Sequence, residues 1–594
     1  MTLNFFAAVI GAIGVCLFAW NSLLLLRALG ATEEPLDGRR PDPIYAVAIG
    51  SICFALSKSY WSASLAAKGG IYVLQVVLEL GFLLSLQFWL RNQSFNAPNQ
   101  TQGLILPLFL FAIGLVNHWP TQTLLIPALF LAYATHRLTT ESQEFFSKHL
   151  SRPWIAAIAG LTTLSLYLYL PLRAHLLPAL DFGHPDNFHR FFKSLLRIFY
   201  FKRETLASFL PTASATILDK SLYISNHLIG DYNLFFDLAA LAGLWALKKK
   251  GLNTQVVFLL FGLLATLMAN AIYLQVTPID YWHMDDHLLT LNWILGLLGT
   301  IGVYQILSLM RNRRLLNILS HTLFTLIPLS MFLSHLPWND QKRETLFRDY
   351  GVEILKSMER GTFYIAESDY DYFSILYLQK AEGKRPDVGM QLVTFLKTAD
   401  WENLKQGLAP GDASINRPLY CAFPNGDFIN TYLRQKSGIS LKPRGILMEI
   451  NPPSTKRVEK VLTQPLEDLW GKTLIPNRRS FNPINGLLQN LCAHPYINMA
   501  LYLGARGQWD NWGDYFVRAL GLITDLRWRA ETWANKAEGD LQRDEKGRAV
   551  QDFLGAYSDY LTIGMVTEAQ VMLEKASVLD PHLGHPTTPS TPNH

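Results

Sequence analysis

Long runs of apolar residues alternate with short polar stretches over the first 340 residues of the chain. The hydrocarbon core of a bilayer is about 30 Å thick, so a spanning helix needs about 20 apolar residues. Ten runs reach or approach that length: 4–28, 44–57, 71–90, 103–117, 120–135, 153–172, 231–247, 254–275, 287–309 and 315–336. The pattern therefore predicts a polytopic α-helical membrane domain over residues 1–340 with about ten spans, of which the second, fourth and fifth are short.

The basic residues between these runs are unevenly distributed. Loops after odd-numbered spans carry most of them, including Arg137 and Lys249, whereas the short loops after even-numbered spans carry only Lys58 and Lys68. Lys and Arg are enriched in cytoplasmic loops, so we expect the odd-numbered side to be cytoplasmic. This orientation predicts a multi-pass inner membrane protein whose Met1 and whole C-terminal part lie on the extracytoplasmic side.

The residues after 340 have the pattern of a soluble protein. Within 341–450, apolar strands at 362–366 and 387–395 flank a helix at 369–382, and "RPLYCAF" and "GILMEI" continue the alternation. Alternating strands and helices predict a small extracytoplasmic α/β domain.

The segment 451–580 is predicted to be helical and similar to a tetratricopeptide repeat. Small and aromatic residues recur at the spacing that lets two helices of such a repeat pack: Tyr560, Gly564, Ala569, Ala576 and Pro581. The helices either offer a surface that docks a protein partner or only cap the domain. The tail, 581–594, has the composition of a disordered segment.

Composition agrees with a membrane part joined to a soluble part. Half of the residues are apolar and only 17% are charged, below the roughly 25% of soluble proteins. The net charge of +5 gives no indication of a nucleic-acid partner. Four cysteines are too few for a disulfide framework, although Cys421 and Cys492 could pair in an oxidising compartment.

An amphipathic helix is predicted near 186–201, just after the sixth run. Pro185 with Asp186 or Asn187 is a helix start signal. Aromatic and aliphatic residues then follow with helical spacing, while Arg190 and Lys193 fall on the opposite face. Such a helix lies in the membrane interface. It either anchors the chain to membrane lipids or borders a groove for a lipid-linked phosphate.

Arg173 lies nearby, at the outer end of "YLPLRA". A guanidinium held at the interface suits bidentate phosphate binding. A long basic side chain that reaches up to the headgroups is the alternative interpretation.

Two further polar groups are expected on the same outer side. Asn117 and His118 form a short connection between two spans, where they either line a site or satisfy helix ends. The stretch "TPIDYWHMDDHLL" contains Asp280, and it places His283, Asp286 and His287 at i, i+3 and i+4 if it is helical. That spacing can hold a divalent metal. Sugar hydroxyls and the helix dipole are the alternative partners of these side chains.

Gln75 and Glu79 share one face of the third predicted span. An ionisable residue within a spanning helix is a functional candidate by default. A hydrogen bond buried inside the helix bundle is the alternative, and the mid-span position of Glu79 favours it.

Four stretches carry a resemblance to a known family: "SYWSASLAAKGGIYVLQ", "GLVNHWPTQTLLIPA", "YLYLPLRA…DFGHPDNFHRFF" and "YFSILYLQKAEGKRPDV". In order and spacing they resemble the bacterial relatives of the transmembrane protein O-mannosyltransferase, within the C-type glycosyltransferases, over most of residues 1–395. The resemblance implies inverting transfer of a mannose-like sugar from a polyprenol-phosphate donor to an acceptor hydroxyl outside the cytoplasm. It implies that Arg173 stabilises the leaving phosphate, and that Asn117, His118 and residues 280–287 shape the pocket.

Two departures from that family concern catalysis. Its members carry a catalytic acid after their first span, whereas here the similarity begins at "LNFFAAVIGAIGV", which resembles a later helix. The acid is therefore expected before Met1, in an N-terminally truncated chain whose catalytic base is unknown. Many relatives also have Glu where this chain has Lys68. The alternative hypothesis is a noncatalytic membrane scaffold that organises envelope proteins through its helical repeats. A transporter is a third hypothesis. Many transporters have paired helices broken by Gly or Pro in two matching halves, and the sequence shows no such pair, which argues against it.

Overall fold

The computed structural model forms two compact units, Met1–Gln341 and Lys342–His594, and each is described by itself. The structure describes the following residues: 2–31, 42–65, 69–92, 105–139, 153–176, 185–196, 213–269, 283–340, 345–366, 369–392, 418–421, 441–444, 446–450, 483–504, 507–509, 512–523, 526–562 and 565–583.

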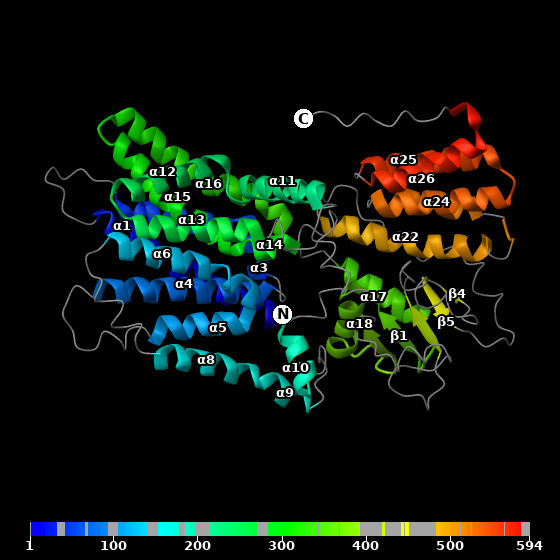
Figure 1. Cartoon of the computed structure of the whole chain (residues 1–594), viewed down its shortest axis with the longest axis horizontal. Helices are drawn as coiled ribbons and strands as arrows, with labels where there is room; N and C mark the ends of the chain where they lie inside the picture. The colour runs from blue at the N-terminus through cyan, green and yellow to red at the C-terminus, as the bar shows by residue number, and fades with distance from the viewer. Residues whose placement is uncertain are drawn as a thin grey trace. The chain divides into compact units, whose positions relative to one another are not determined.

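The described part of the first unit is helical (Figure 1). Its helices are α1 (Thr2–Ala28), α2 (Pro43–Leu56), α3 (Lys58–Leu65), α4 (Gly69–Asn92), α5 (Ile105–Gln122), α6 (Leu125–Thr139), α8 (Pro153–Tyr167), α9 (Tyr169–Ala174), α10 (Phe188–Leu195), α11 (Ala213–Asp231), α12 (Leu234–Lys249), α13 (Asn253–Met268), α14 (His283–His287), α15 (Leu289–Met310) and α16 (Arg314–Asn339). Local chemistry fixes several starts. Asp42 accepts a hydrogen bond from Ile44 N ahead of α2, and Asn233 accepts one from Phe235 N ahead of α12, as N-cap residues do.

Several of these helices are long and apolar enough to cross a membrane. Four meet both criteria within the described residues, namely α1, α4, α15 and α16. The pair α2 and α3, bent by 61° at Ser57, makes a fifth if it is one span, and α13 is a shorter apolar helix. The predicted count of about ten spans is therefore not confirmed, although the helices mark the first unit as a membrane domain.

Three predicted spans differ from the observed helices. The run 103–117 continues to Gln122, because the helix kinks at His118 instead of ending there. Pro120 lacks a backbone N–H and disturbs the preceding turn, and the chain then turns into α6 at 123–124. The run 153–172 breaks between α8 and α9. The run 287–309 begins only at Leu289, after the separate five-residue α14.

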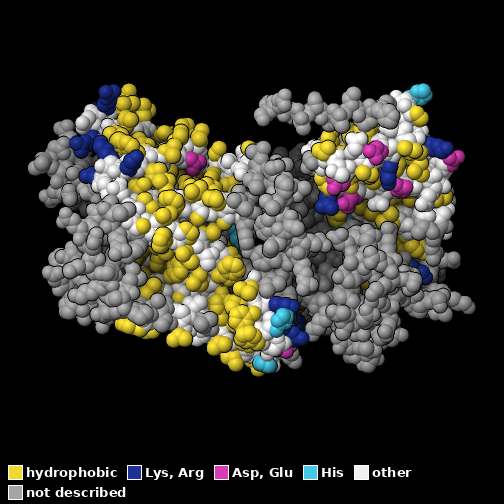
Figure 2. Space-filling model, viewed as in Figure 1, with side chains coloured by type: hydrophobic (Ala, Val, Ile, Leu, Met, Phe, Trp, Pro, Cys, Tyr) yellow, Lys and Arg dark blue, Asp and Glu magenta, His cyan; other side chains and the backbone are white. Residues whose placement is uncertain are grey.

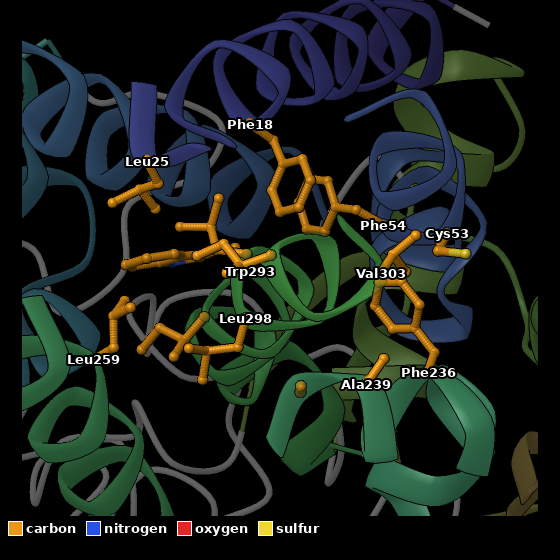
Figure 3. Packing of buried hydrophobic residues seen from close by; sticks show 14 of the residues in the cluster. Phe18, Leu25, Cys53, Phe54, Phe236, Ala239, Leu259, Trp293, Leu298 and Val303 are labelled. Atoms are coloured by element: carbon orange, nitrogen blue, oxygen red, sulfur yellow. The ribbon is translucent and has the colours of Figure 1, made fainter. Parts of the chain in front are cut away.

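Helix α15 lies at the centre of the hydrophobic core of this unit. Trp293 and Val303 of α15 are buried among Phe18 of α1, Phe54 of α2 and Phe236 of α12 (Figure 3). Small residues bring two of these helices close together, since a Cβ at Gly302 would overlap the carbonyl oxygen of Ala239 in α12. Close backbone approach at small residues is the usual basis of helix packing within membranes.

The direction of the helices separates the basic loops from the polar cluster described below. Tyr232, just before α12, donates to Asn292 O in the first turn of α15, and Ala239 meets Gly302 further along both helices. Helices α12 and α15 therefore run parallel, which puts Lys249 and Arg311 at one end and His287 at the other. Figure 2 shows apolar side chains over the flanks of this unit, with Lys and Arg gathered towards its ends.

The second unit begins with α17 (Leu346–Ser357) and a five-stranded mixed sheet of order β2-β1-β3-β5-β4. Its strands are β1 (Phe363–Ala366), β2 (Gly389–Leu392), β3 (Leu419–Cys421), β4 (Leu441–Arg444) and β5 (Leu447–Ile450), and α18 (Asp369–Ala381) connects the parallel strands β1 and β2. This strand–helix–strand order agrees with the sequence pattern. Strand β4 was not predicted; its Pro443 is tolerated because β4 lies at the sheet edge. Cys421 is buried in β3, and the side chain of Cys492 lies outside the described residues, so the pairing of the two cysteines stays a prediction.

The rest of the described second unit is helical: α22 (Pro483–Gly504), α23 (Trp512–Leu522), α24 (Leu526–Gln542), α25 (Lys546–Thr562), α26 (Val566–Leu579) and η8 (Pro581–Leu583). Tyr560 of α25 and Ala569 of α26 pack in one cluster, and Ala576 packs in another. Gly564 lies outside the described residues, and the assignment as a tetratricopeptide repeat remains a prediction. The predicted tail forms the short turn η8 at its start and is not described from residue 584 on.

Candidate functional site

Three rings from three helices meet at the end of the first unit opposite Lys249. Tyr72 near the start of α4 lies 5.2 Å from His118 of α5 and 5.6 Å from His287 of α14, between ring centroids. His118 and His287 are themselves 5.2 Å apart. The structure thus brings together His118 and His287, which were predicted as parts of two separate polar groups, and it adds Tyr72. We call these three side chains the ring cluster.

The kink in α5 orients His118. Its backbone is non-helical, with φ −153° and ψ 78°, and its Nδ1 lies 2.8 Å from Thr121 Oγ1. The Thr121 hydroxyl donates its proton to the carbonyl oxygen of His118 at 3.2 Å, so it can only accept from Nδ1. The proton of His118 is therefore assigned to Nδ1, and Nε2 is an acceptor.

Below the ring cluster, hydrogen-bonded amides continue into the bundle. Asn117 donates to Ile71 O at 2.9 Å and to Gln75 Oε1 at 3.1 Å. Gln75 donates to Gln122 Oε1 and, at 3.1 Å, to Glu79 Oε1. Asn117 therefore holds the end of α5 against the start of α4, next to the ring cluster.

Glu79 is fully buried at the foot of this column. Trp293 Nε1 donates to its Oε2 at 2.7 Å, and Thr290 Oγ1 lies 3.0 Å from the same oxygen. With Gln75 on the other oxygen, the carboxylate joins α4 to α15. A buried acceptor that is satisfied by several donors holds helices together. This agrees with the interpretation of Glu79 as a buried hydrogen-bond partner inside the bundle.

A second polar network lies at the same end of the unit, on α11. His227 Nε2 lies 3.0 Å from Ser59 Oγ, and His227 Nδ1 lies 3.0 Å from Asp285 Oδ1. Tyr223 donates to the same Asp285 oxygen at 2.7 Å. The backbone N–H of Ser59 donates to Asp231 Oδ1 at 2.7 Å. We call Ser59, His227 and Asp285 the relay.

Charge sets the protonation of the relay. Burial lowers the pKa of His227, but the charge and hydrogen bond of Asp285 and the charge of Asp231 raise it by more, so the pKa lies above its ordinary value. Burial and the neighbouring Asp285 raise the pKa of Tyr223, which stays a donor. Burial lowers the pKa of Lys220, one more polar residue of α11.

The predicted residues of 280–287 divide between these two groups. Asp285, which the sequence reasoning did not choose, contacts His227, whereas the predicted Asp286 is half-buried. Asp280 and the side chain of His283 lie outside the described residues. No group of three or more His, Cys, Asp or Glu that could hold a metal occurs in the part of the chain that the structure describes.

The predicted basic residues lie on two short helices. Arg173 is exposed in the last turn of α9. Arg190 pairs with Asp186 at 2.9 Å, and Lys193 is half-buried. Among the described contacts no hydrogen bond or ion pair joins Arg173 to the ring cluster.

Helix α10 begins as predicted and is shorter than predicted. Asn187 is its N-cap and accepts from Arg190 N, and the helix ends at Leu195 instead of near 201. Phe188 is 79% exposed on its apolar face. The basic residues of α10 therefore lie beside an exposed aromatic surface.

Sequence reasoning missed the whole relay. A signal was present in α11: Lys220, Tyr223, His227 and Asp231 recur at i, i+3, i+7 and i+11, which places them on one helical face. Residues 173–230 contain no apolar run of spanning length, so hydropathy alone does not point to this helix. The pairing of Ser59 with His227 and Asp285 is tertiary and has no local signal.

Comparisons with known proteins bear on the N-terminal part of the chain. Residues 1–142 match the family model of the protein O-mannosyl-transferase TMEM260 N-terminal domain. The match supports an O-mannosyltransferase-like family, and thus a glycosyltransferase, as the resemblance implied. It includes Ser59, Tyr72 and His118, whereas His227 and His287 lie beyond it. Neither the curated proteins nor the solved structures contain a match to this chain.

Proposed function

We propose that this protein is a membrane glycosyltransferase that moves a mannose-like sugar from a polyprenol-phosphate donor to an acceptor hydroxyl, on protein, at the extracytoplasmic side. One observation carries the proposal. His118, inside the matched segment, is in ring contact with His287, at the bundle end opposite the basic loops. The alternative, a noncatalytic scaffold, has no specific observation in its favour.

The chemistry of the ring cluster suits a sugar. Aromatic rings pack against the apolar face of a pyranose, and imidazole nitrogens exchange hydrogen bonds with its hydroxyls. The acceptor nitrogen of His118, Nε2, can accept a hydrogen bond from a sugar hydroxyl. Asn117 already donates two bonds to α4, so its role is to hold the helix end that carries His118.

The donor carries a lipid and a phosphate, and the first unit has features for both. Its outer faces expose large apolar side chains, such as Leu172 and Phe188, which lipid tails can cover. Arg173, Arg190 and Lys193 lie on the two short helices beside such side chains. In the proposal these cations bind the phosphate of the donor, and Arg173 stabilises it as it leaves.

A transfer assay tests the proposal. The purified full chain in detergent is given a short-chain polyprenyl phosphomannose and a peptide that contains Ser and Thr. We expect one hexose on the peptide by mass spectrometry, and about a tenfold or greater loss in kcat/KM for His118→Ala and for His287→Ala. His321→Ala is the matched control, because the imidazole of His321 in α16 contacts Asn317 O and the ring of Tyr45, neither of which belongs to the ring cluster. A wild-type chain that leaves the peptide unmodified with every donor chain length contradicts the proposal.

A further inference from the structure

Helix α14, which carries His287, is too short to fix its own position. It contains five residues, His283–His287, and helices of so few residues depend on tertiary contacts for their stability. The turn that follows it is closed by the N–H of Leu288, which donates to Asp285 O at 3.2 Å. The place of His287 in the ring cluster therefore depends on contacts that other elements make with α14.

Two side chains of α11 hold α14 through one carboxylate. Tyr223 donates to Asp285 Oδ1 at 2.7 Å, and His227 Nδ1 lies 3.0 Å from the same oxygen. A carboxylate oxygen only accepts hydrogen bonds, so His227 Nδ1 is assigned as the second donor. Residues four apart lie on one face of a helix, and both bonds therefore come from one face of α11. Asp285 is two residues before His287.

Apolar packing lies beside these two hydrogen bonds. Ile224 of α11 is 3% exposed and packs in one cluster with Leu288 and Leu291. Ile224 directly follows Tyr223, and Leu288 directly follows α14. Apolar contacts are non-directional, whereas hydrogen bonds have a preferred geometry. The packing therefore brings α11 close to the start of α15, and the bonds to Asp285 fix the orientation of α14.

The imidazole of His227 also links α14 to α3. Its Nε2 lies 3.0 Å from Ser59 Oγ, and the N–H of Ser59 donates to Asp231 Oδ1 at 2.7 Å. Helices α3, α11 and α14 lie together at this end of the unit (Figure 1). Helix α3 precedes α4, which carries Tyr72 of the ring cluster. The relay thus joins the segment before Tyr72 to the segment before His287.

The surroundings of His227 suit a residue that positions another group. It is 8% exposed, and protein groups lie at both of its ring nitrogens, Asp285 at Nδ1 and Ser59 at Nε2. A side chain held on both sides keeps one geometry, as the support of a functional residue requires. A displacement of about 1 Å can cost about 10²-fold in rate, so α11 can affect transfer without contact with the sugar.

We propose that Tyr223 and His227 are positioning residues of the sugar transfer, which hold α14 through Asp285 and so keep the His287 ring in the ring cluster. This inference rests on the proposed function. The sugar contacts the ring cluster, and the two residues of α11 act on it only through His287. Their effects on transfer should therefore disappear when the His287 imidazole is removed.

A double-mutant cycle tests this with the full chain in detergent, short-chain polyprenyl phosphomannose and the Ser/Thr peptide. Tyr223→Phe removes one hydroxyl and keeps the ring, and we expect kcat/KM to fall about threefold to tenfold. In a His287→Ala background the same substitution should change kcat/KM by less than about twofold. His227→Ala should show the same pattern with a larger loss. A residue that only stabilises the fold would give equal fold-changes in both backgrounds.

Two further substitutions are controls. Tyr45 of α2 also donates its hydroxyl proton, to His321 O at 2.8 Å, and His321 belongs neither to the ring cluster nor to α14. Tyr45→Phe should therefore leave kcat/KM within about twofold of the wild type. Asp285→Asn keeps an oxygen that can accept from Tyr223 and should stay within about threefold, whereas Asp285→Ala should lose about tenfold or more.

Hydrogen exchange of residues 283–288 gives a measurement that is independent of activity. Tyr223→Phe should speed this exchange by about threefold or more, because one bond that holds α14 is lost, and Tyr45→Phe should leave it unchanged. If transfer by His287→Ala is too slow to measure, or His227→Ala does not fold, the exchange in Tyr223→Phe decides. Exchange equal to that of the wild type overturns the positioning role.

The outcomes separate this inference from the proposed function. An active wild type in which Tyr223→Phe leaves kcat/KM unchanged overturns the positioning role and leaves the glycosyltransferase standing. Equal fold-changes with and without the His287 imidazole overturn it in the same way, for Tyr223 or for His227. A wild type that transfers no sugar overturns both.

Discussion

The rings of His118 and His287 lie 5.2 Å apart, although they come from two helices that are distant in the sequence. His118 is placed by a kink that precedes Pro120, and His287 by a short helix that ends just before α15. The contact exists only when both irregular elements are formed. The effects of the two imidazoles on activity should therefore be coupled.

The first prediction concerns the pair His118 and His287. His118→Ala and His287→Ala should each reduce kcat/KM, and the double variant should lose less than the sum of the two effects, by about 1 kcal/mol of coupling, as contacting residues do. A double-mutant cycle on kcat/KM measures the coupling. The pair His118 and His321 is the control and should be additive; additivity for His118 and His287 as well would show that their contact has no functional meaning.

Glu79 provides a prediction on stability. Replacing it by Leu leaves Trp293 Nε1 and Thr290 Oγ1 without this acceptor, whereas Gln75 Nε2 keeps its bond to Gln122 Oε1. A buried unsatisfied donor costs about 1–3 kcal/mol, so Glu79→Leu should lower the free energy of unfolding more than Trp293→Phe, which removes one donor. Unfolding in detergent micelles by added SDS, followed by circular dichroism, measures both. Equal stability of Glu79→Leu and wild type would refute the structural role.

The packing of α12 against α15 supplies the third prediction. Gly302→Leu would place side-chain atoms where the backbone of Ala239 lies, and we expect a loss of about 3 kcal/mol or more, or no folded protein. Gly160→Leu in α8 is the matched control, because a Cβ at Gly160 meets nothing within 4 Å. Folded yield after size-exclusion chromatography compares the two. Similar yields would mean that the helices do not approach closely at Gly302.

The sequence predicted the long regular helices and missed their irregularities. The apolar runs 4–28, 71–90 and 315–336 became α1, α4 and α16 with shifts of a few residues, because burial in lipid demands length and low polarity, which are local properties. The break at Leu288 does not show in hydropathy, because the apolar run 287–309 continues through it, whereas the run 44–57 ends where α2 does.

The candidate site was predicted in part for the same reason. Asn117, His118 and His287 stood out because polar residues at the ends of apolar runs are visible in the sequence. Tyr72 was not chosen, since an aromatic residue in a spanning run has no local mark of function. The relay was missed because α11 lies in a stretch too polar to count as a span.

The second unit yields a prediction from a buried ion cluster. Lys536 donates to Asp552 at 2.6 Å and to Asp540 at 3.1 Å within the helical region. Lys536→Met leaves the buried Asp552 without a cation and Asp540 with only Arg543, 3.7 Å away, and we expect a loss of about 3–5 kcal/mol. Lys575→Met is the control; Lys575 and its partner Glu538 are about half exposed, and an exposed pair contributes less than about 1 kcal/mol. Hydrogen exchange of α24 and α25 in the full chain reports both effects.

The loss of stability in Lys536→Met should also depend on pH, in a direction set by the pKa of Asp552. Burial first, and then Asp540, raise the pKa of Asp552 to about 6. A carboxyl whose folded pKa lies above its unfolded value gains stability as pH falls through the folded pKa. Lys536 lowers this pKa in the wild type, so in Lys536→Met the pKa should be higher and Asp552 should be protonated first as pH falls. The deficit of Lys536→Met should therefore shrink on acidification down to about pH 6. A deficit that grows on acidification would contradict this assignment.

Sugar transfer measured separately on each side of the membrane tests most directly whether the ring cluster is an extracytoplasmic glycosyltransferase site. Right-side-out and inverted membrane vesicles that contain the protein and labelled polyprenyl phosphomannose are each given a membrane-impermeant Ser/Thr peptide. The account predicts labelled peptide with right-side-out vesicles, loss of that label in His118→Ala, and no label with inverted vesicles. Transfer confined to inverted vesicles, or absent from both, would contradict an extracytoplasmic glycosyltransferase site at the ring cluster.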